Sequence, residues 1–174
     1  SMAVQALARE ELGLDVETMW ANDGFVVRWP ESDAIPDVKY LLPKASDVER
    51  LVISQLSQTP LFAARFREIA SRALLLPRKR PGQRTPLWQL RKKAQDLMSA
   101  AAQYPSFPMI LETYRECLRD VFDMPALIET LKDIERRTVT VTTADPKTPS
   151  PLASSLLFGY VANFLYEGDA PLAE

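Results

Sequence analysis

An indole ring followed by cations is the feature of this sequence best suited to chemistry with a partner. Arg91 and Lys92 come three and four residues after Trp88, and this spacing places them beside the ring on the surface of a helix. A tryptophan in such a setting stacks on a nucleobase while the cations follow the phosphates of a single strand. Each stacked base contributes about 1–3 kcal/mol, and phosphate contacts make binding weaken with salt.

A basic loop, residues 77–85, precedes this tryptophan and leads into Thr85-Pro86, a pair typical of a helix start. The unpaired N–H groups and the dipole of a helix N-terminus favour an anion. We therefore expect the loop and the helix end to hold the same phosphate. The candidate nucleic-acid-binding residues are Trp88, Arg84, Arg78, Lys79, Arg80, Arg91 and Lys92.

Other interpretations of these residues stay open. A tryptophan in the first turn of a helix often packs back into the core, and a run of cations is often a solvated loop. Trp20 and Trp29, on the expected hairpin, are typical of cross-strand packing. Arginine and tryptophan are also enriched at protein interfaces, so a protein partner is the rival to a nucleic acid.

The net charge of the chain conceals an uneven distribution. The 174 residues include 21 Lys and Arg against 23 Asp and Glu, a formal charge of −2 that by itself argues against a nucleic-acid partner. Residues 65–93, however, hold ten basic residues and one acid, a net +9, so the remainder carries −11. Such asymmetry indicates a surface for a polyanion.

The residues of most enzyme sites are missing. There is no histidine, and the single cysteine, Cys117, is predicted to lie in the core. The five glycines form neither a phosphate-binding loop nor a dinucleotide fingerprint. Carboxylate pairs such as Glu112 with Glu116 alternate with arginines, which is typical of an exposed ion-pair face. We therefore expect no catalytic residue, no cofactor and no metal in this chain.

The elements that position these residues are mostly helices. Residues 1–43 are predicted to form a helix ending at Gly13 and a β-hairpin over 15–20 and 25–30, part of a small sheet. Residues 44–174 are predicted to form a helical body that contains the basic loop 77–85 and a third strand over 138–143. Within it, a helix from Pro86 is expected to turn Leu87 inward. The expected fold is α+β, mostly helical with an antiparallel sheet of about three strands, in one compact domain.

No segment of the sequence suggests a membrane partner. The most apolar stretch, residues 152–166, is interrupted by Ser154, Ser155 and Asn163 and falls short of the ~20 apolar residues that a bilayer requires. We expect a buried helix there. No targeting signal is visible at the N-terminus.

Several motifs, in order along the chain, resemble the helicase-associated region of Lhr-type (large helicase-related) bacterial DNA helicases. They cover residues 61–68, 72–78, 86–89, 104–108, 116–118, 150–151, 155–161 and 166–174. The resemblance extends over about residues 16–174. Leu90 and Leu152 depart from it, because a polar residue and an aromatic one are expected there.

The resemblance implies a longer parent protein that moves 3′ to 5′ on single-stranded DNA and opens duplexes, including RNA:DNA hybrids, in DNA repair. Such a superfamily 2 helicase uses ATP and magnesium in two motor domains, which with a winged helix would precede this region. The chain would then be a non-catalytic, cytoplasmic accessory domain on the path of the tracking strand, with Trp88 stacking on a base. The alternative is an interaction or scaffolding domain that docks on the motor domains or on a partner.

Overall fold

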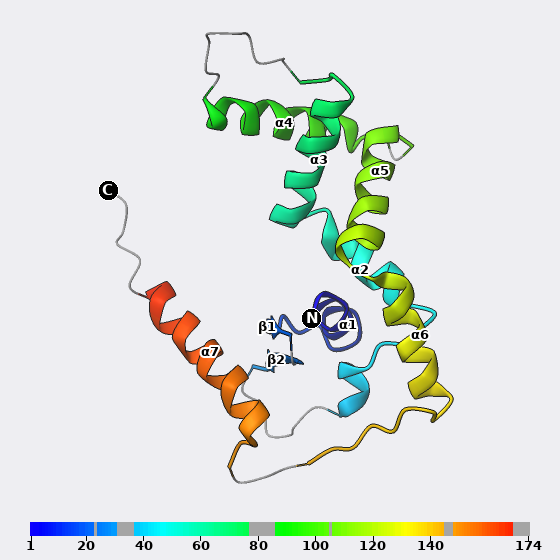
Figure 1. Ribbon diagram of the computed structural model, residues 1–174, viewed down its shortest axis with the longest axis vertical. Coiled ribbons are helices and arrows are strands. Elements are labelled where there is room, and N and C mark those ends of the chain that lie inside the picture. The colour runs from blue at the N-terminus through cyan, green and yellow to red at the C-terminus, as the bar shows by residue number, and fades with distance from the viewer. Residues whose placement is uncertain (23, 31–36, 77–85, 105, 145–147, 169–174) are drawn as a thin grey trace. The chain divides into compact units, whose positions relative to one another are not determined.

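The computed structural model describes residues 1–174 except 23, 31–36, 77–85, 105, 145–147 and 169–174. The chain divides into two compact units, one of Ser1–Lys44 with Asp133–Glu174 and one of Ala45–Lys132. Figure 1 labels their helices and strands. Helices predominate among the described residues and the strands form a small antiparallel sheet, so the predicted α+β, mostly helical fold is confirmed.

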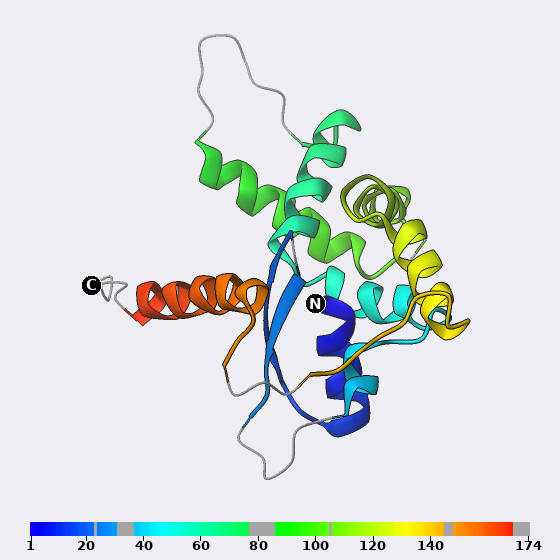
Figure 2. The same cartoon turned by 60° about the horizontal axis from the view of Figure 1, so that its bottom comes forward.

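The first unit is built around a β-hairpin. Its elements are α1 (Met2–Leu12), β1 (Glu17–Ala21), β2 (Gly24–Arg28), the 3-10 turn η1 (Val38–Leu41) and α7 (Pro151–Gly168). The strands are antiparallel, with Trp20 opposite Phe25, and α1 and α7 lie on opposite sides of the hairpin (Figure 2). Gly13 ends α1 at a φ of +65°, as predicted, because glycine adopts the left-handed region without steric cost.

Small residues bring α7 close to the hairpin. The Cδ1 atom of Leu156 lies 3.3 Å from the position that a Cβ on Gly24 would take, which is tighter than most such contacts. A hydrogen bond adds to this packing, since the Tyr160 hydroxyl donates to the Glu17 carboxylate at 3.1 Å. Arg28 also donates to that carboxylate, at 3.3 Å. The hairpin and α7 are therefore held together by both packing and polar contacts.

The second unit is a helical bundle. Its elements are α2 (Val48–Leu56), α3 (Pro60–Arg72), α4 (Leu87–Ala101), α5 (Pro108–Glu116), the π-helical turn η2 (Cys117–Val121) and the greater part of α6 (Met124–Glu135). α3 begins at the predicted place, because the Thr59 hydroxyl accepts the Phe62 N–H at 3.1 Å and Pro60 occupies the first position.

One apolar stripe of α3 forms much of the core of this unit. Phe62, Phe66 and Ile69 are buried, and α3 packs against α4 and α5. The Phe62 ring lies 4.7 Å from the ring of Tyr114 on α5, in a tilted arrangement that aromatic pairs favour. Cys117 is fully buried, which confirms its predicted place in the core.

The predicted third strand is wrong. Residues 138–143 do not pair with the hairpin, and the sheet of the described residues has two strands, β1 and β2. The backbone N–H groups of Thr138 and Val139 instead donate to the Asp133 carbonyl, at 2.8 and 3.2 Å, where α6 ends. The valines then line a hollow with Leu42 and Ile134. Alternation of Thr and Val favours an extended backbone but does not specify a partner strand.

The expectation of a buried helix over 152–166 is also wrong for residues 152–162, the part of this stretch whose side chains the structure describes. Leu152, Leu157, Phe158 and Val161 of α7 are all exposed, and Phe158 retains 77% of its accessible surface. Only the side that carries Leu156 and Tyr160 contacts the hairpin. In the part of the chain that the structure describes, no helix is long and apolar enough to cross a membrane.

The end of α3 contains an unusual leucine. Leu74 has a φ of +60°, and the N–H groups of Leu74 and Leu75 donate to the carbonyls of Ser71 and Ala70, at 3.2 and 2.9 Å. This is a Schellman turn with leucine where glycine is usual. Because Leu74 is exposed, its side chain contributes little packing to offset the strain of the left-handed backbone.

Replacement of this leucine by glycine should stabilise the fold. We expect Leu74→Gly to raise the free energy of unfolding by about 0.5–1 kcal/mol, because it relieves the left-handed strain. Leu75→Gly is the matched control, since Leu75 is also exposed but does not have a positive φ, and should lower the free energy. Urea denaturation of the three proteins measures both changes. A loss of stability in Leu74→Gly as large as that in Leu75→Gly would contradict the assignment.

Candidate nucleic-acid interface

The first turn of α4 presents two large apolar side chains to solvent. α4 begins after Pro86, whose carbonyl accepts the N–H of Gln89 at 3.1 Å. Leu87 is 69% exposed, so the expectation that it points inward is wrong, and Trp88 is 63% exposed. The buried side of the helix is carried by Ala94 and Ala101 farther along. Trp88 is therefore a surface residue, and the interpretation that it packs into the core is excluded.

The cations that follow Trp88 are exposed beside it. Arg91 and Lys92 are both exposed, and their spacing places them on the turn of α4 next to that of Trp88, on the same side of the helix. Neither forms an ion pair with any residue in the described ranges. Exposed cations one turn from an accessible indole suit a stacked base and its phosphates.

Four of the sequence-predicted residues cannot be placed. Arg78, Lys79, Arg80 and Arg84 lie outside the described residues, as does Thr85, the residue expected to start α4. The structure thus brings together Trp88, Arg91 and Lys92 among the predicted set.

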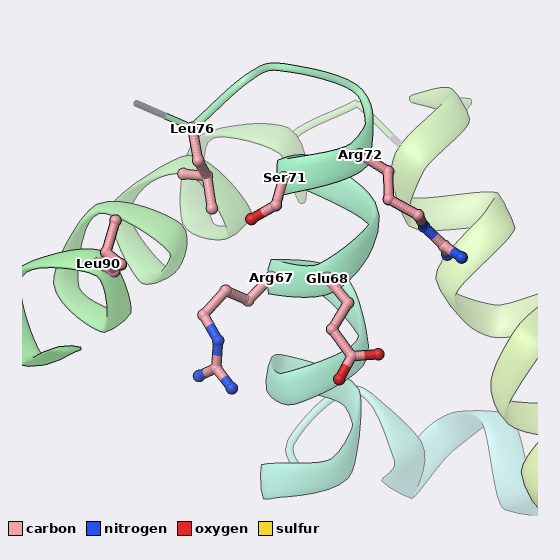
Figure 3. Close-up of a pocket in the computed structure, with 6 residues that line it drawn as sticks. All are labelled: Arg67, Glu68, Ser71, Arg72, Leu76 and Leu90. Atoms are coloured by element: carbon pink, nitrogen blue, oxygen red, sulfur yellow. The ribbon is translucent and has the colours of Figure 1, made fainter. Parts of the chain in front are cut away.

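A hollow between α3 and α4 contains a further candidate binding residue, Arg67, that was not predicted from the sequence. It has a volume of about 420 Å³ and is lined by Arg67, Glu68, Ser71, Arg72, Leu76 and Leu90. Figure 3 shows Arg67 and Ser71 pointing from α3 toward the side on which Leu90 lies, whereas Arg72 points toward α5. The only sequence signal for Arg67 is its place in the basic stretch 65–93, next to the buried Phe66.

Ion pairs neutralise other arginines of this unit. Arg65 donates to Glu68 at 2.9 Å, and Arg72 is paired with Glu116 of α5. The Arg115 guanidinium donates to Glu112 at 2.9 and 2.5 Å, and this hydrogen bonding lowers the pKa of the Glu112 carboxyl. The prediction of an exposed ion-pair face is confirmed for Glu112, whereas Glu116 is largely buried and pairs with α3 instead.

The tryptophans of the hairpin region differ in their surroundings. Trp20 lies opposite Phe25 in the strand register, as a cross-strand pair does, yet it is 72% exposed. Trp29 is partly buried and follows the last residue of β2, so it is not part of the ladder. The cross-strand interpretation therefore applies to Trp20 and not to Trp29.

The described residues offer little to a catalytic centre. Burial raises the pKa of the Cys117 thiol, and this favours the unreactive protonated form. Among the residues whose positions the structure gives, no group of three or more Cys, Asp or Glu side chains is arranged to hold a metal ion.

Comparison with known proteins identifies the family. Residues 1–153 match the family model described as DEAD/H associated. The chain belongs to the DEAD/H-associated family.

Relatives of this DEAD/H-associated chain are much longer proteins. It is 47% identical over 175 residues to an Lhr helicase of Mycolicibacterium smegmatis, covering the whole chain and 12% of that protein. It is also 47% identical over 163 residues to an Lhr helicase/uracil glycosylase of Escherichia coli, covering 93% of the chain and 11% of that protein. The resemblance to Lhr helicases is therefore confirmed.

A solved structure shares the fold of this DEAD/H-associated chain. It is the structure of the Mycobacterium smegmatis helicase Lhr bound to single-stranded DNA and AMP-PNP. The match has a TM-score of 0.78 at 45% identity and covers 91% of this chain and 20% of that one. In that protein a domain of this fold thus belongs to a helicase bound to DNA.

The exposure of Trp88 predicts that its removal leaves the DEAD/H-associated fold intact. We expect Trp88→Ala to change the free energy of unfolding by less than about 0.5 kcal/mol, as surface substitutions do. Phe66→Ala, which empties a buried site on α3, should lower it by about 3–5 kcal/mol. Thermal and urea denaturation measure both. If Trp88→Ala lowered the free energy of unfolding by more than about 2 kcal/mol, the Trp88 side chain would have to pack in the core.

Proposed function

We propose that this chain is the accessory nucleic-acid-binding domain of an Lhr-like superfamily 2 ATP-dependent 3′–5′ DNA helicase, where it guides the tracking single strand. The observation that supports this most directly is the exposed Trp88, with the exposed cations Arg91 and Lys92 beside it. An exposed indole leaves apolar surface in water, and stacking on a base removes that surface. The similarity to a helicase bound to single-stranded DNA supports the same conclusion.

The resemblance to Lhr helicases supports a division of work between this chain and motor domains. This chain binds and orients the strand, and hydrolysis of ATP with magnesium takes place in motor domains outside it. A winged helix and the two motor domains are its partners within the same polypeptide. The strand is single-stranded DNA or the DNA strand of an RNA:DNA hybrid, and the setting is the bacterial cytoplasm. In this scheme the four cations of the basic loop contact phosphates near the N-terminus of α4.

A second candidate function is docking on another domain or on a partner protein. The observation that favours it is the exposed apolar side of α7, with Leu157, Phe158 and Val161. Accessible apolar residues clustered on one side of a helix are typical of surfaces that bind proteins. This surface belongs to the first unit, whereas Trp88 belongs to the second, so the two functions can be tested by separate substitutions.

Titration with a labelled oligothymidylate tests the proposed function. We expect the 174-residue chain to bind at about 50 mM salt and more weakly at about 200 mM, because phosphate contacts release counterions. Trp88→Ala should raise the Kd about tenfold or more, through loss of stacking, and Arg84→Ala should raise it less. Fluorescence anisotropy measures each Kd.

The matched control is Phe158→Ala, which also removes an exposed aromatic side chain but lies on α7. It should leave the Kd for the oligothymidylate unchanged. The proposal fails if the chain does not bind at the lower salt concentration, or if binding responds neither to salt nor to Trp88→Ala and Arg84→Ala. Denaturation of each variant establishes that it is folded.

A further inference from the structure

Arg67 lies on α3, at the hollow between α3 and α4, where the carboxylate in the lining, that of Glu68, is already paired with Arg65. Its side chain is partly buried and points into the hollow (Figure 3). It forms no ion pair within the part of the chain that the structure describes, whereas Arg65 and Arg72 on the same helix are both paired. A partly desolvated cation without an anionic partner favours the binding of an anion.

Ser71 adds a second donor to the same side of the hollow. It follows Arg67 by four residues on α3, so the two side chains lie one turn apart, and both point toward Leu90. The hydroxyl of Ser71 makes no hydrogen bond to the described residues. The carboxylate at the rim, that of Glu68, is bound to Arg65 at 2.9 Å. A guanidinium and a hydroxyl are therefore the donors that an incoming ligand would meet.

Leu76 and Leu90 make the remaining wall apolar. Leu76 is buried after the end of α3, and Leu90 is partly buried on α4. The volume of about 420 Å³ lies within the range of pockets that hold small organic molecules. Anion donors on one side and an apolar wall on the other match the two halves of a nucleotide, a phosphate and a sugar with its base.

The hollow adjoins the start of α4, where the other residues proposed to bind the strand are found. Leu76 immediately precedes the basic loop 77–85 in the sequence, and Leu90 is four residues after Pro86. Around α4, the exposed Leu87 lies between Leu90 and Trp88, about 60° from the first and about 100° from the second, so Leu90 and Trp88 are about 160° apart. A strand that crosses the first turn of α4 over Leu87 can therefore reach both the hollow and Trp88.

We propose that the hollow between α3 and α4 is a binding subsite for one nucleotide of the single strand, with Arg67 and Ser71 donating to its phosphate and Leu76 and Leu90 facing its sugar or base. This inference rests on the proposed function and adds a second point of contact to Trp88. It assigns to Arg67 a direct role in strand binding that is separate from the basic loop.

Substitution of Arg67 with a matched control tests the subsite. Arg67→Gln should raise the Kd of the 174-residue chain for an oligothymidylate about five- to tenfold at about 50 mM salt. It should also reduce the slope of log Kd against log salt by about 0.7, the value for one lost phosphate contact on a single strand. Ser71→Ala should raise the Kd about two- to threefold without changing the slope, because it removes a neutral donor.

Arg119→Gln is the control. Arg119 is an exposed arginine of the same unit that lines a different hollow, with Leu118 and Ile128, and its substitution changes the net charge by the same amount. It should leave the Kd within about twofold, the size of a general charge effect at the surface. Circular dichroism and denaturation verify that all variants are folded.

The outcomes separate this inference from the proposed function. If the unsubstituted chain binds and Trp88→Ala weakens binding, but Arg67→Gln behaves as Arg119→Gln does, the subsite is overturned and the proposed function stands. If Arg67→Gln and Arg119→Gln both weaken binding to the same extent, the effect is one of net charge and the subsite is again overturned. If the unsubstituted chain fails to bind at about 50 mM salt, both are overturned. Specific loss with Arg67→Gln and Ser71→Ala supports the subsite.

Discussion

The fold of the second unit depends on the packing of α3 against its neighbours α4 and α5. Phe62 lines a hollow together with Met98 of α4 and Ile110 of α5, and its ring packs on that of Tyr114. Burial of this stripe fixes the rotation of α3 about its axis, so that Arg67 and Ser71 lie on the side toward α4 while Arg72 lies on the side toward α5. The chemical character of each side of α3 therefore follows from where its phenylalanines pack.

The carboxylates of this unit are distributed so that they neutralise one side of it. Glu112 and Glu116 of α5 bind Arg115 and Arg72, and Glu68 binds Arg65 within α3. The cations of α4 have no such partners among the residues that the structure describes. Among the described residues of the basic stretch, the cations without an ion pair are therefore those of α4 and Arg67 at the hollow, although the whole chain carries a formal charge of −2.

Local signals in the sequence predicted most of the elements but not the contacts between them. Thr59-Pro60 and Gly13 indicated helix ends because capping and left-handed turns depend on a few adjacent residues. The predictions of a strand over 138–143 and of a buried Leu87 were wrong, because strand pairing and side-chain packing depend on residues distant in the sequence. The cluster of Trp88, Arg91 and Lys92 could be predicted from helical spacing alone. The hollow could not, since it exists only where α3 and α4 meet.

The only thiol of the chain is that of Cys117, the first residue of η2, and its side chain is fully buried. Thiolates, rather than thiols, attack disulfides and electrophiles, and burial disfavours the thiolate here. Disulfide exchange also requires that the attacking sulfur reach its partner. Two copies of this chain cannot be joined through sulfur unless the core of the second unit opens, so covalent dimers formed under oxidising conditions would report local unfolding.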